Sequence, residues 1–435
     1  MSPNNITSES LDLPHVIYTP FTPKGEVTVP PSKSDVHRAI ICAALSKGKC
    51  TLSPVALSND IKATIGCIKA LGAKAEIQGN TLTVDGTDLF SKKEALLDCG
   101  ESGSTLRFFI PLAALGGVNA KFVGHGLLPQ RPIGVFTEAL PKAGVECKTE
   151  GGLPLEISGR LQSGKFEVPG NVSSQFITGL LFALPLLEKD SDIVLTSPIQ
   201  SLSYINMTIY TMSRFGVDIE TTDCGWHIKG GQRYTPCSYV TDGDWSHAAF
   251  FMVSGAVNGS VTVKGVKKNS VQGDKKIAEL ISKFGARVDW QKDYVTVESA
   301  PMKALTIDAS QIPDLVPVLA VCASFAEGTT RIINAERLRI KECDRLKATA
   351  EMLNALGGKV RETADGLEIT GVKSLKSGLV NGYNDHRIVM SAAACASKLE
   401  GEIECTYAMS INKSYPNFFE DYISIGGKAN VIDLG

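Results

Sequence analysis

The sequence predicts an α/β protein of two lobes, each of which contains three βαβαββ units. A helix-like segment runs into a glycine six times, and these glycines are separated by 72, 72, 69, 72 and 69 residues: Gly72, Gly144, Gly216, Gly285, Gly357 and Gly426. Repetition at a fixed period is the sequence signature of a repeat architecture. A chain of 435 residues is also too long to form a single ordinary hydrophobic core, so the six units divide most naturally into two groups of three.

Each unit starts with a stretch that is apolar on all sides, which is typical of a buried helix. The six stretches cover residues 39–45, 106–115, 176–187, 248–257, 315–325 and 388–397. A strand rich in β-branched residues follows, as in residues 259–266 and 328–335. The second helix is amphipathic, as in residues 274–284, and the repeat glycine ends it as a C-cap before two further strands.

The two lobes are predicted to take unequal parts of the chain. Residues 31–242 form one lobe, and residues 1–30 join residues 243–435 in the other, because the sixth unit is one strand short at Gly435. We expect the segment from Gly25 to Val29 to supply a missing strand. The chain then crosses between the lobes twice, which suits a body that opens and closes on a hinge.

Composition limits the classes of function. Apolar residues make up 43% of the chain and charged residues 21%, as in soluble globular proteins, and a net charge of −2 gives no general attraction to nucleic acid or membranes. The eleven cysteines include no C-x-x-C pair, which indicates reduced and mostly buried thiols. The first fifteen residues lack the basic and apolar regions of a signal peptide, and no apolar run reaches roughly 18 residues. We therefore expect a cytoplasmic protein.

Polar and charged residues stand at the helix starts of every unit. Helix N-termini offer free N–H groups and partial positive charge, so several of them facing one cleft would attract an anion, above all phosphate. Eight cations occupy equivalent unit-start positions, although Lys and Arg are unfavourable at helix N-termini: Lys33, Arg38, Arg107, Arg131, Lys341, Arg345, Arg387 and Lys413. We expect an anionic substrate to hold them, with phosphates or carboxylates that arginine grips through two hydrogen bonds.

Taken one at a time, the same segments also fit structural roles. Ser173, Ser174 and Gln175 suit an ordinary helix cap as well as a polyhydroxyl or phosphate ligand. Asp314 fits an N-cap, and Pro132, after Arg131, fits the first position of a helix. The joint pattern, rather than any single motif, favours a binding site.

Ten short motifs, in their order and spacing, resemble the 5-enolpyruvylshikimate-3-phosphate synthase family of enolpyruvyl transferases. They cover nearly the whole chain and read PPSKSDVHRA, GESGSTLR, QRPIG, NVSSQF, SLSYI, QGD, IPD, RIKECDRL, YNDHR and NKSYPNFFEDY. The resemblance implies the two-lobed arrangement called an inside-out α/β barrel. It also implies transfer of the enolpyruvyl group of phosphoenolpyruvate to the 5-hydroxyl of shikimate 3-phosphate, with release of phosphate, in the shikimate pathway to the aromatic amino acids. We expect a monomer with no metal ion, organic cofactor, nucleic-acid partner or membrane partner.

The resemblance also assigns roles to residues, motif by motif. It implies that shikimate 3-phosphate is bound by Lys33, Ser34, Arg38, Ser173, Ser174, Gln175, Ser201, Tyr204, Asp314 and Lys341. It implies that phosphoenolpyruvate is bound by Lys33, Gly103, Arg131, Gln175, Arg345, Arg387 and Lys413. Asp314, Glu342 and Lys33 are the implied catalytic residues, with Asp314 and Glu342 as the proton-transfer pair. Such a pair fits the chemistry, because carbon 3 of the enol must gain a proton while the attacking hydroxyl loses one.

Four positions depart from the family pattern. Glu101 and His37 stand where many relatives carry Asn, Leu127 where some carry Arg, and Arg337 where some carry a ligand-binding Asn. These differences leave the substrate contacts at positions 101, 127 and 337 open. Gly103 keeps the small residue that, in the family, leaves room for glyphosate, so we predict inhibition by glyphosate.

Two alternatives compete with this interpretation. The closer one is the sister enzyme that transfers enolpyruvyl to UDP-N-acetylglucosamine, which often uses a cysteine on a mobile loop near Arg131. Residues 124–134 contain no cysteine. The other is a non-catalytic ring such as a sliding clamp on DNA, which would place cations along helix faces rather than at helix starts.

Overall fold

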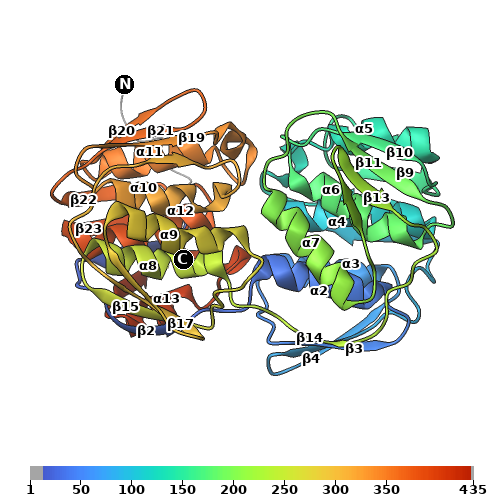
Figure 1. Cartoon of the computed structure of the whole chain (residues 1–435), viewed down its shortest axis with the longest axis horizontal. Coiled ribbons are helices and arrows are strands. Elements are labelled where there is room, and N and C mark those ends of the chain that lie inside the picture. The colour runs from blue at the N-terminus through green and yellow to red at the C-terminus, as the bar shows by residue number, and fades with distance from the viewer. Residues whose placement is uncertain (1–12, 433–435) are drawn as a thin grey trace. The chain divides into compact units, whose positions relative to one another are not determined.

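The computed structural model describes residues 13–432, which form an α/β fold of two compact units. Unit 1 consists of residues 13–30 and 242–432, and unit 2 consists of Pro31–Thr241. Within these residues each unit contains three four-stranded sheets of mixed strand direction (Figure 1), so the predicted architecture of six α/β repeats is confirmed. No helix of residues 13–432 combines the length and the apolar character that crossing a membrane requires.

Unit 2 contains the first three repeats, each with the order strand, buried helix, strand, second helix and two strands. The first repeat comprises β14 (Ser238–Val240), α2 (Lys33–Leu45), β3 (Lys49–Ser53), α3 (Asn59–Ala70), β4 (Lys74–Gln78) and β5 (Thr81–Asp85). The second comprises β6 (Glu94–Asp98), α4 (Gly103–Gly116), β7 (Asn119–Val123), α5 (Gly134–Ala139), β8 (Val145–Lys148) and β9 (Leu155–Gly159). The third comprises β10 (Lys165–Val168), α6 (Ser174–Ala183), β11 (Ser191–Leu195), α7 (Leu202–Arg214), β12 (Glu220–Thr222) and β13 (Gly225–Ile228).

Unit 1 contains the other three repeats in the same order of elements. The fourth repeat comprises β2 (Lys24–Thr28), α8 (Trp245–Val257), β15 (Ser260–Lys264), α9 (Lys276–Phe284), β16 (Arg287–Trp290) and β17 (Tyr294–Glu298). The fifth comprises β18 (Thr306–Asp308), α10 (Val316–Ala323), β19 (Thr329–Ile333), α11 (Arg345–Ala355), β20 (Lys359–Glu362) and β21 (Leu367–Thr370). The sixth comprises β22 (Leu375–Val380), α12 (His386–Cys395), β23 (Leu399–Cys405), α13 (Phe418–Ser424), β24 (Lys428–Ile432) and β1 (His15–Thr19).

Three strands close repeats to which they are not adjacent in sequence. The predicted segment from Gly25 to Val29 forms β2, but β2 pairs in parallel with β15 of the fourth repeat and does not fill the sixth. The gap in the sixth sheet is filled by β1, which lies between β23 and β24 and is antiparallel to both. Strand β1 was not predicted, although its residues HVIYT include the β-branched and aromatic types that favour strands. In unit 2, β14 pairs in parallel with β3 in the same way.

The six repeat glycines all follow the second helix of their repeat and all have a positive φ. The values lie between 78° at Gly357 and 122° at Gly285. L-residues with a Cβ rarely adopt such backbone angles, whereas glycine does so without a steric penalty. Gly144 and Gly285 are C-caps as predicted, and the other four glycines stand directly after the C-cap residue, where they end the helix in the same way.

The first helices of the repeats form the interior of each unit. In unit 1, α8, α10 and α12 contact one another, and in unit 2, α4 contacts α6. Every residue of α8 and of α10 is buried, as their apolar sequences predict. Because burial of these helices fixes their direction, the polar residues at their starts are placed by the same packing.

Candidate active site

In unit 1, one guanidinium group gathers three carboxylates. Arg345 begins α11 and is only 1% exposed. Its Nε donates to Asp385 Oδ2 at 2.7 Å and its Nη2 to Asp385 Oδ1 at 3.3 Å. It also donates from Nη1 to Asp314 Oδ1 at 2.9 Å and from Nη2 to Glu342 Oε2 at 2.7 Å. These charge-assisted contacts fix the two predicted proton-transfer residues relative to each other.

Asp385 accounts for the position of Arg345. Its side chain is completely buried, and it caps α12 by accepting the Arg387 N–H at 2.9 Å. The Cys343 thiol also donates to it at 3.5 Å. Sequence reasoning did not assign Asp385, although an aspartate directly before a very apolar helix is an N-cap signal.

Asp314 lies among cations in the short 3-10 turn Pro313–Leu315, which leads into α10. Arg387 Nη2 is 3.3 Å from Asp314 Oδ2, and Lys341 Nζ is 3.9 Å from Oδ1. Burial alone raises the pKa of Asp314, but Arg387, Lys341 and Arg345 outweigh it and hold that pKa well below its usual value. Asp314 is therefore an ionised carboxylate at neutral pH. Asp314 lies inside the turn and does not cap the helix, so the N-cap role that its position in the sequence also fits is wrong.

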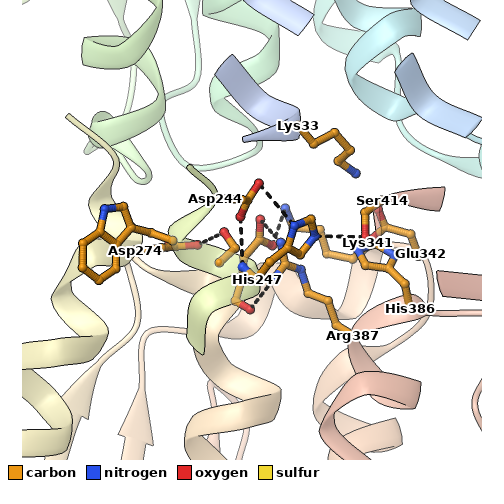
Figure 2. Close-up of polar contacts among 12 residues, drawn as sticks. Lys33, Asp244, His247, Asp274, Lys341, Glu342, His386, Arg387 and Ser414 are labelled. Carbon is orange, nitrogen blue, oxygen red and sulfur yellow. Dashed lines mark hydrogen bonds and ion pairs between the residues drawn. The ribbon is translucent and has the colours of Figure 1, made fainter. Parts of the chain in front are cut away.

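Lys341 and Lys413 complete this group of unit 1 residues. Burial lowers the pKa of Lys341 to about 8, although Asp314 opposes the shift. Lys413 Nζ donates to the backbone carbonyl of Asn384 at 2.6 Å, directly before Asp385 in the chain. Figure 2 shows Lys341, Glu342 and Arg387 together with Asp244, His247 and Ser414, which come from the start of α8 and from the turn that carries Lys413.

In unit 2, the start of α2 carries two cations with different surroundings. Lys33 Nζ donates to Asp60 Oδ2 at 2.7 Å. Arg38 is buried and donates to the backbone carbonyls of Ser34 at 2.6 Å and Tyr204 at 3.0 Å.

Arg38 ties α2 to α7. Its Nε donates to Thr208 Oγ1 at 2.8 Å, and its guanidinium lies 5.5 Å from the ring of Phe108 and 5.9 Å from that of Tyr204. Burial lowers the pKa of Arg38 to about 10, so it remains a cation at neutral pH.

The starts of α4 and α6 meet through the amide of Gln175. Its Oε1 accepts from Arg107 Nη1 at 2.6 Å, and its Nε2 donates to Ser104 Oγ at 2.9 Å. Ser173 caps α6 by accepting the Gln175 N–H at 3.3 Å. The predicted hydroxyl and amide residues are therefore part of the helix start, while Ser174 beside them is buried.

Ser201 and Tyr204 mark the start of α7. Ser201 is a buried residue in the left-handed region with φ of 54°, and its carbonyl accepts the Tyr204 N–H at 3.1 Å. A positive φ is uncommon for a non-glycine residue and is often found at functional sites. This backbone angle supports a ligand-binding role for Ser201.

Gly103 leaves room for the guanidinium of Arg131. A Cβ at position 103 would lie 2.6 to 2.9 Å from three atoms of that guanidinium. The loop before α5 is also held by Arg107, which donates to the carbonyl of Pro132 at 3.0 Å. The prediction that Pro132 opens the helix was wrong, because α5 begins at Gly134 and Ile133 is its N-cap.

Two of the positions that depart from the family pattern have clear structural contacts. His37 is buried, its Nδ1 lies 2.7 Å from Thr64 Oγ1, and burial holds its pKa well below the usual value. Arg337 is buried and donates to the carbonyl of Ser310 at 3.0 Å. Leu127 is exposed, and nothing in the structure explains its replacement of arginine.

The expectation that the clustered cations require an external anion was incomplete. Carboxylates of the chain itself contact several of them: Asp60 contacts Lys33, and Asp314, Glu342 and Asp385 contact Arg345. The contacts bring Asp314, Lys341, Glu342, Arg345 and Arg387 together in unit 1. In unit 2, Lys33, Arg38 and Gln175 each contact a different set of partners. Asp60 and Asp385 are partners that the sequence reasoning missed. The signal for Asp60 was weak, since it stands two residues after the N-cap Ser58 of an ordinary amphipathic helix.

Comparisons with known proteins agree with one another. The family model described as EPSP synthase (3-phosphoshikimate 1-carboxyvinyltransferase) matches residues 19–422. The 3-phosphoshikimate 1-carboxyvinyltransferase of Clostridium novyi is 43% identical over 422 residues, which cover 94% of this chain and 97% of that protein. The corresponding enzyme of Clostridium kluyveri is 43% identical over 423 residues, which cover 97% of this chain and 99% of that protein.

Solved structures show the same fold at lower sequence identity. The EPSP synthase from Acinetobacter baumannii matches 96% of this chain and all of its own, with a TM-score of 0.81 and 23% identity. The enolpyruvyl transferase NikO from Streptomyces tendae matches 97% of this chain and 99% of its own, with a TM-score of 0.78 and 17% identity.

Proposed function

Because this chain belongs to the EPSP synthase (3-phosphoshikimate 1-carboxyvinyltransferase) family, we propose how its residues divide the work of that reaction. The protein transfers the enolpyruvyl group of phosphoenolpyruvate to the 5-hydroxyl of shikimate 3-phosphate, in the shikimate pathway, and releases phosphate. Its fold is the inside-out α/β barrel of that family. The curated relatives decide against transfer to UDP-N-acetylglucosamine and against a DNA clamp.

We assign proton transfer to Asp314 and Glu342 of unit 1. The reaction must remove the proton of the attacking hydroxyl and add one to carbon 3 of the enol. Asp314 fits the base, because nearby cations keep it ionised. Glu342 fits the group that protonates carbon 3, since the same arginine holds it at a different position from Asp314. The shared contact with Arg345 is the observation that carries this assignment.

Shikimate 3-phosphate binding is assigned mainly to unit 2. Lys33, Ser34, Ser173, Ser174, Gln175, Ser201 and Tyr204 supply a cation, hydroxyls, an amide and an aromatic ring at three helix starts. The partial positive charge of a helix N-terminus favours a phosphate there. Arg38 adds its charge and also positions Ser34 and Tyr204, because its guanidinium donates to both of their carbonyls. Asp314 and Lys341 complete the set from unit 1.

Phosphoenolpyruvate binding is assigned to the remaining cations. Lys33, Arg131, Arg387 and Lys413 balance the charge of the substrate and stabilise the leaving phosphate, with Gly103 and Gln175 beside them. Arg345 belongs to this group, but its contacts with three carboxylates indicate that it mainly orients the acids. The residues assigned to the two substrates therefore come from both units.

The remaining expectations also stay proposals. We propose that the protein acts in the cytoplasm, where its eleven thiols remain reduced, since all of them are free cysteines and eight are buried. We propose that it acts as a monomer.

The test of this assignment is phosphate release with both substrates present, compared with either substrate alone. Release should require both. Lys33→Ala should lower kcat/KM at least about a hundredfold, because it removes a cation from both proposed substrate sites. Lys74→Ala is the matched control, since Lys74 also pairs with an aspartate, Asp88, but on the exposed surface. Equal activity of the two variants would refute the proposed site.

A further inference from the structure

The first turn of α8 ties together segments that are far apart in the sequence of unit 1. The Trp245 N–H donates to Gln272 Oε1 at 3.1 Å, and Ser246 Oγ donates to Asp274. Asp244 is the N-cap and accepts the N–H of His247 at 2.9 Å. Each residue of this turn therefore has a hydrogen-bond partner that fixes its position.

His247 contacts the turn that follows Lys413. Its side chain is 2% exposed, and its Nε2 lies 3.2 Å from Ser414 Oγ. The imidazole ring lies 4.7 Å from the ring of Tyr415 with an interplanar angle of 39°. Its Nδ1 lies 3.6 Å from Asp244 Oδ2. The dashed lines of Figure 2 join His247 to Asp244 on one side and to Ser414 on the other.

The turn that His247 contacts directly follows Lys413 in the chain and is held by its own hydrogen bonds. The N–H groups of Ser414 and Tyr415 both donate to the carbonyl of Ile411, at 3.0 and 2.7 Å. The Tyr415 hydroxyl donates to Asp421 Oδ2 at 2.7 Å, which fixes the far end of the ring. At its tip, Lys413 Nζ donates to the carbonyl of Asn384. A shift of Ser414 would therefore move the base of the lysine side chain relative to this anchor.

We propose that His247 is a positioning residue for phosphoenolpyruvate, which acts by holding Ser414 and Tyr415 so that Lys413 is presented to the anionic groups of that substrate. The histidine itself makes no substrate contact in this proposal. The inference rests on the proposed role of Lys413 and goes beyond it, because it names the residue that fixes the lysine in place. Packing and one hydrogen bond carry the effect, so the expected change is moderate.

The test compares two replacements of His247 that differ in reach. His247→Asn is too short to reach Ser414 and should raise KM for phosphoenolpyruvate about five- to tenfold, the loss expected for one buried hydrogen bond. His247→Gln places an amide nitrogen near the position of Nε2 and should restore KM to within about twofold of the parent. In both variants KM for shikimate 3-phosphate should stay within about twofold. His227→Asn, which removes a half-buried histidine paired with Asp192, is the matched control and should change nothing.

A double-mutant cycle separates positioning from general loss of structure. Ser414→Ala should raise KM for phosphoenolpyruvate as His247→Asn does, and the double variant should be no worse than either single one. The melting temperature of each variant shows whether it is folded, and Ser414→Ala keeps the test valid if the histidine variants unfold. Additive effects, equal increases of both KM values, or an unchanged KM for phosphoenolpyruvate would overturn the proposal.

Lys413→Ala tests the proposed role of Lys413 separately from the inference about His247. If it leaves KM for phosphoenolpyruvate unchanged, the assignment of Lys413 fails and the inference about His247 fails with it. If Lys413→Ala raises that KM but His247→Asn does not, only the inference about His247 is refuted.

Discussion

Arg345 of unit 1 and Arg38 of unit 2 are both buried arginines at helix starts, but their partners differ. Arg345 is held by three carboxylates, whereas Arg38 is held by two carbonyls, a hydroxyl and two aromatic rings. The pKa values respond in opposite directions. Burial disfavours the charge of Arg345, yet Asp385, Glu342 and Asp314 outweigh it and raise its pKa well above the usual value. Burial lowers the pKa of Arg38 to about 10.

This difference shows how the same repeat can serve two kinds of chemistry. In unit 1 the charge of the arginine is used to hold acids, and this fits a group that moves protons. In unit 2 the hydrogen-bond partners of the arginine are neutral, and burial outweighs the opposing effect of Tyr204 and Asp35 on its pKa. Less of its charge is therefore offset by acids than in Arg345. The repeat fixes where the side chains start, and the partners at each start decide what they do.

Glu342→Gln tests the unit 1 half of this comparison and should have the largest effect. It keeps the size of the side chain but removes a group that can give and take a proton, so kcat should fall about a hundred- to ten-thousandfold. Both KM values should stay within a few-fold, as determined by steady-state phosphate release. Glu279→Gln, in an exposed pair with Lys283, is the control and should leave kcat unchanged. A variant with more than a tenth of the parental kcat would exclude Glu342 as a proton-transfer group.

Removing one partner from each arginine compares the two regions directly. Asp385→Asn takes a charge from the buried contact with Arg345 and should cost about 3 to 5 kcal/mol of unfolding free energy. Thr208→Val removes a neutral partner of Arg38 and should cost about 1 kcal/mol. Denaturant-induced unfolding followed by circular dichroism gives both values. If the two costs were equal, the distinction between ionic and neutral anchoring would be wrong.

The sequence predicted the six repeats. For the side-chain contacts of the site it usually predicted one partner but not the other. Periodic glycines and apolar stretches depend on local chain geometry, so the six α/β repeats and their C-caps followed from them. The partners Asp60 and Asp385 depend on which helices meet in three dimensions, and no spacing in the sequence encodes that. Strand β1 was missed for the same reason, because its sheet is completed by residues almost four hundred positions away.

The candidate site was predictable to a similar extent. The cations at the helix starts were identified as a set, but their charge was attributed to a substrate alone. The contact between Gly103 and Arg131 was beyond sequence reasoning, although the family resemblance had pointed to both residues. Such a contact depends on how closely a loop approaches a helix start. Here the approach leaves no room for a Cβ at position 103.

Gly103→Ala should have a smaller effect than the changes above and acts in unit 2. The new methyl group would overlap the guanidinium of Arg131 and displace it, so KM for phosphoenolpyruvate should rise about tenfold or more. Inhibition by glyphosate, which we predict to compete with phosphoenolpyruvate, should weaken at least as much. Gly66→Ala is the matched control, because a Cβ at Gly66 in α3 meets nothing within 4 Å. It should leave KM unchanged and raise stability by about 0.5 to 1 kcal/mol.

If Gly103→Ala behaved like Gly66→Ala, the close approach of Arg131 would have no role in substrate binding. Absence of competition between glyphosate and phosphoenolpyruvate in the parent would refute the predicted inhibition.

The titration of Lys341 should have the smallest effect. As the pH rises, it should weaken binding of shikimate 3-phosphate but increase the stability of the fold. Burial lowers its pKa in the folded protein from 10.5 to about 8, so the ammonium group is lost as the pH rises from 7 to 9. KM for shikimate 3-phosphate should therefore rise several-fold over that range, and Lys341→Arg, which stays charged, should flatten the rise.

The contribution of Lys341 to stability should change the other way. The unfolded chain binds its proton up to a higher pH than the folded one, so this contribution increases between about pH 8 and 10.5. A KM for shikimate 3-phosphate that stayed constant from pH 7 to 9 in the parent would show that Lys341 keeps its charge over this range and that its anionic neighbours in unit 1 outweigh its burial.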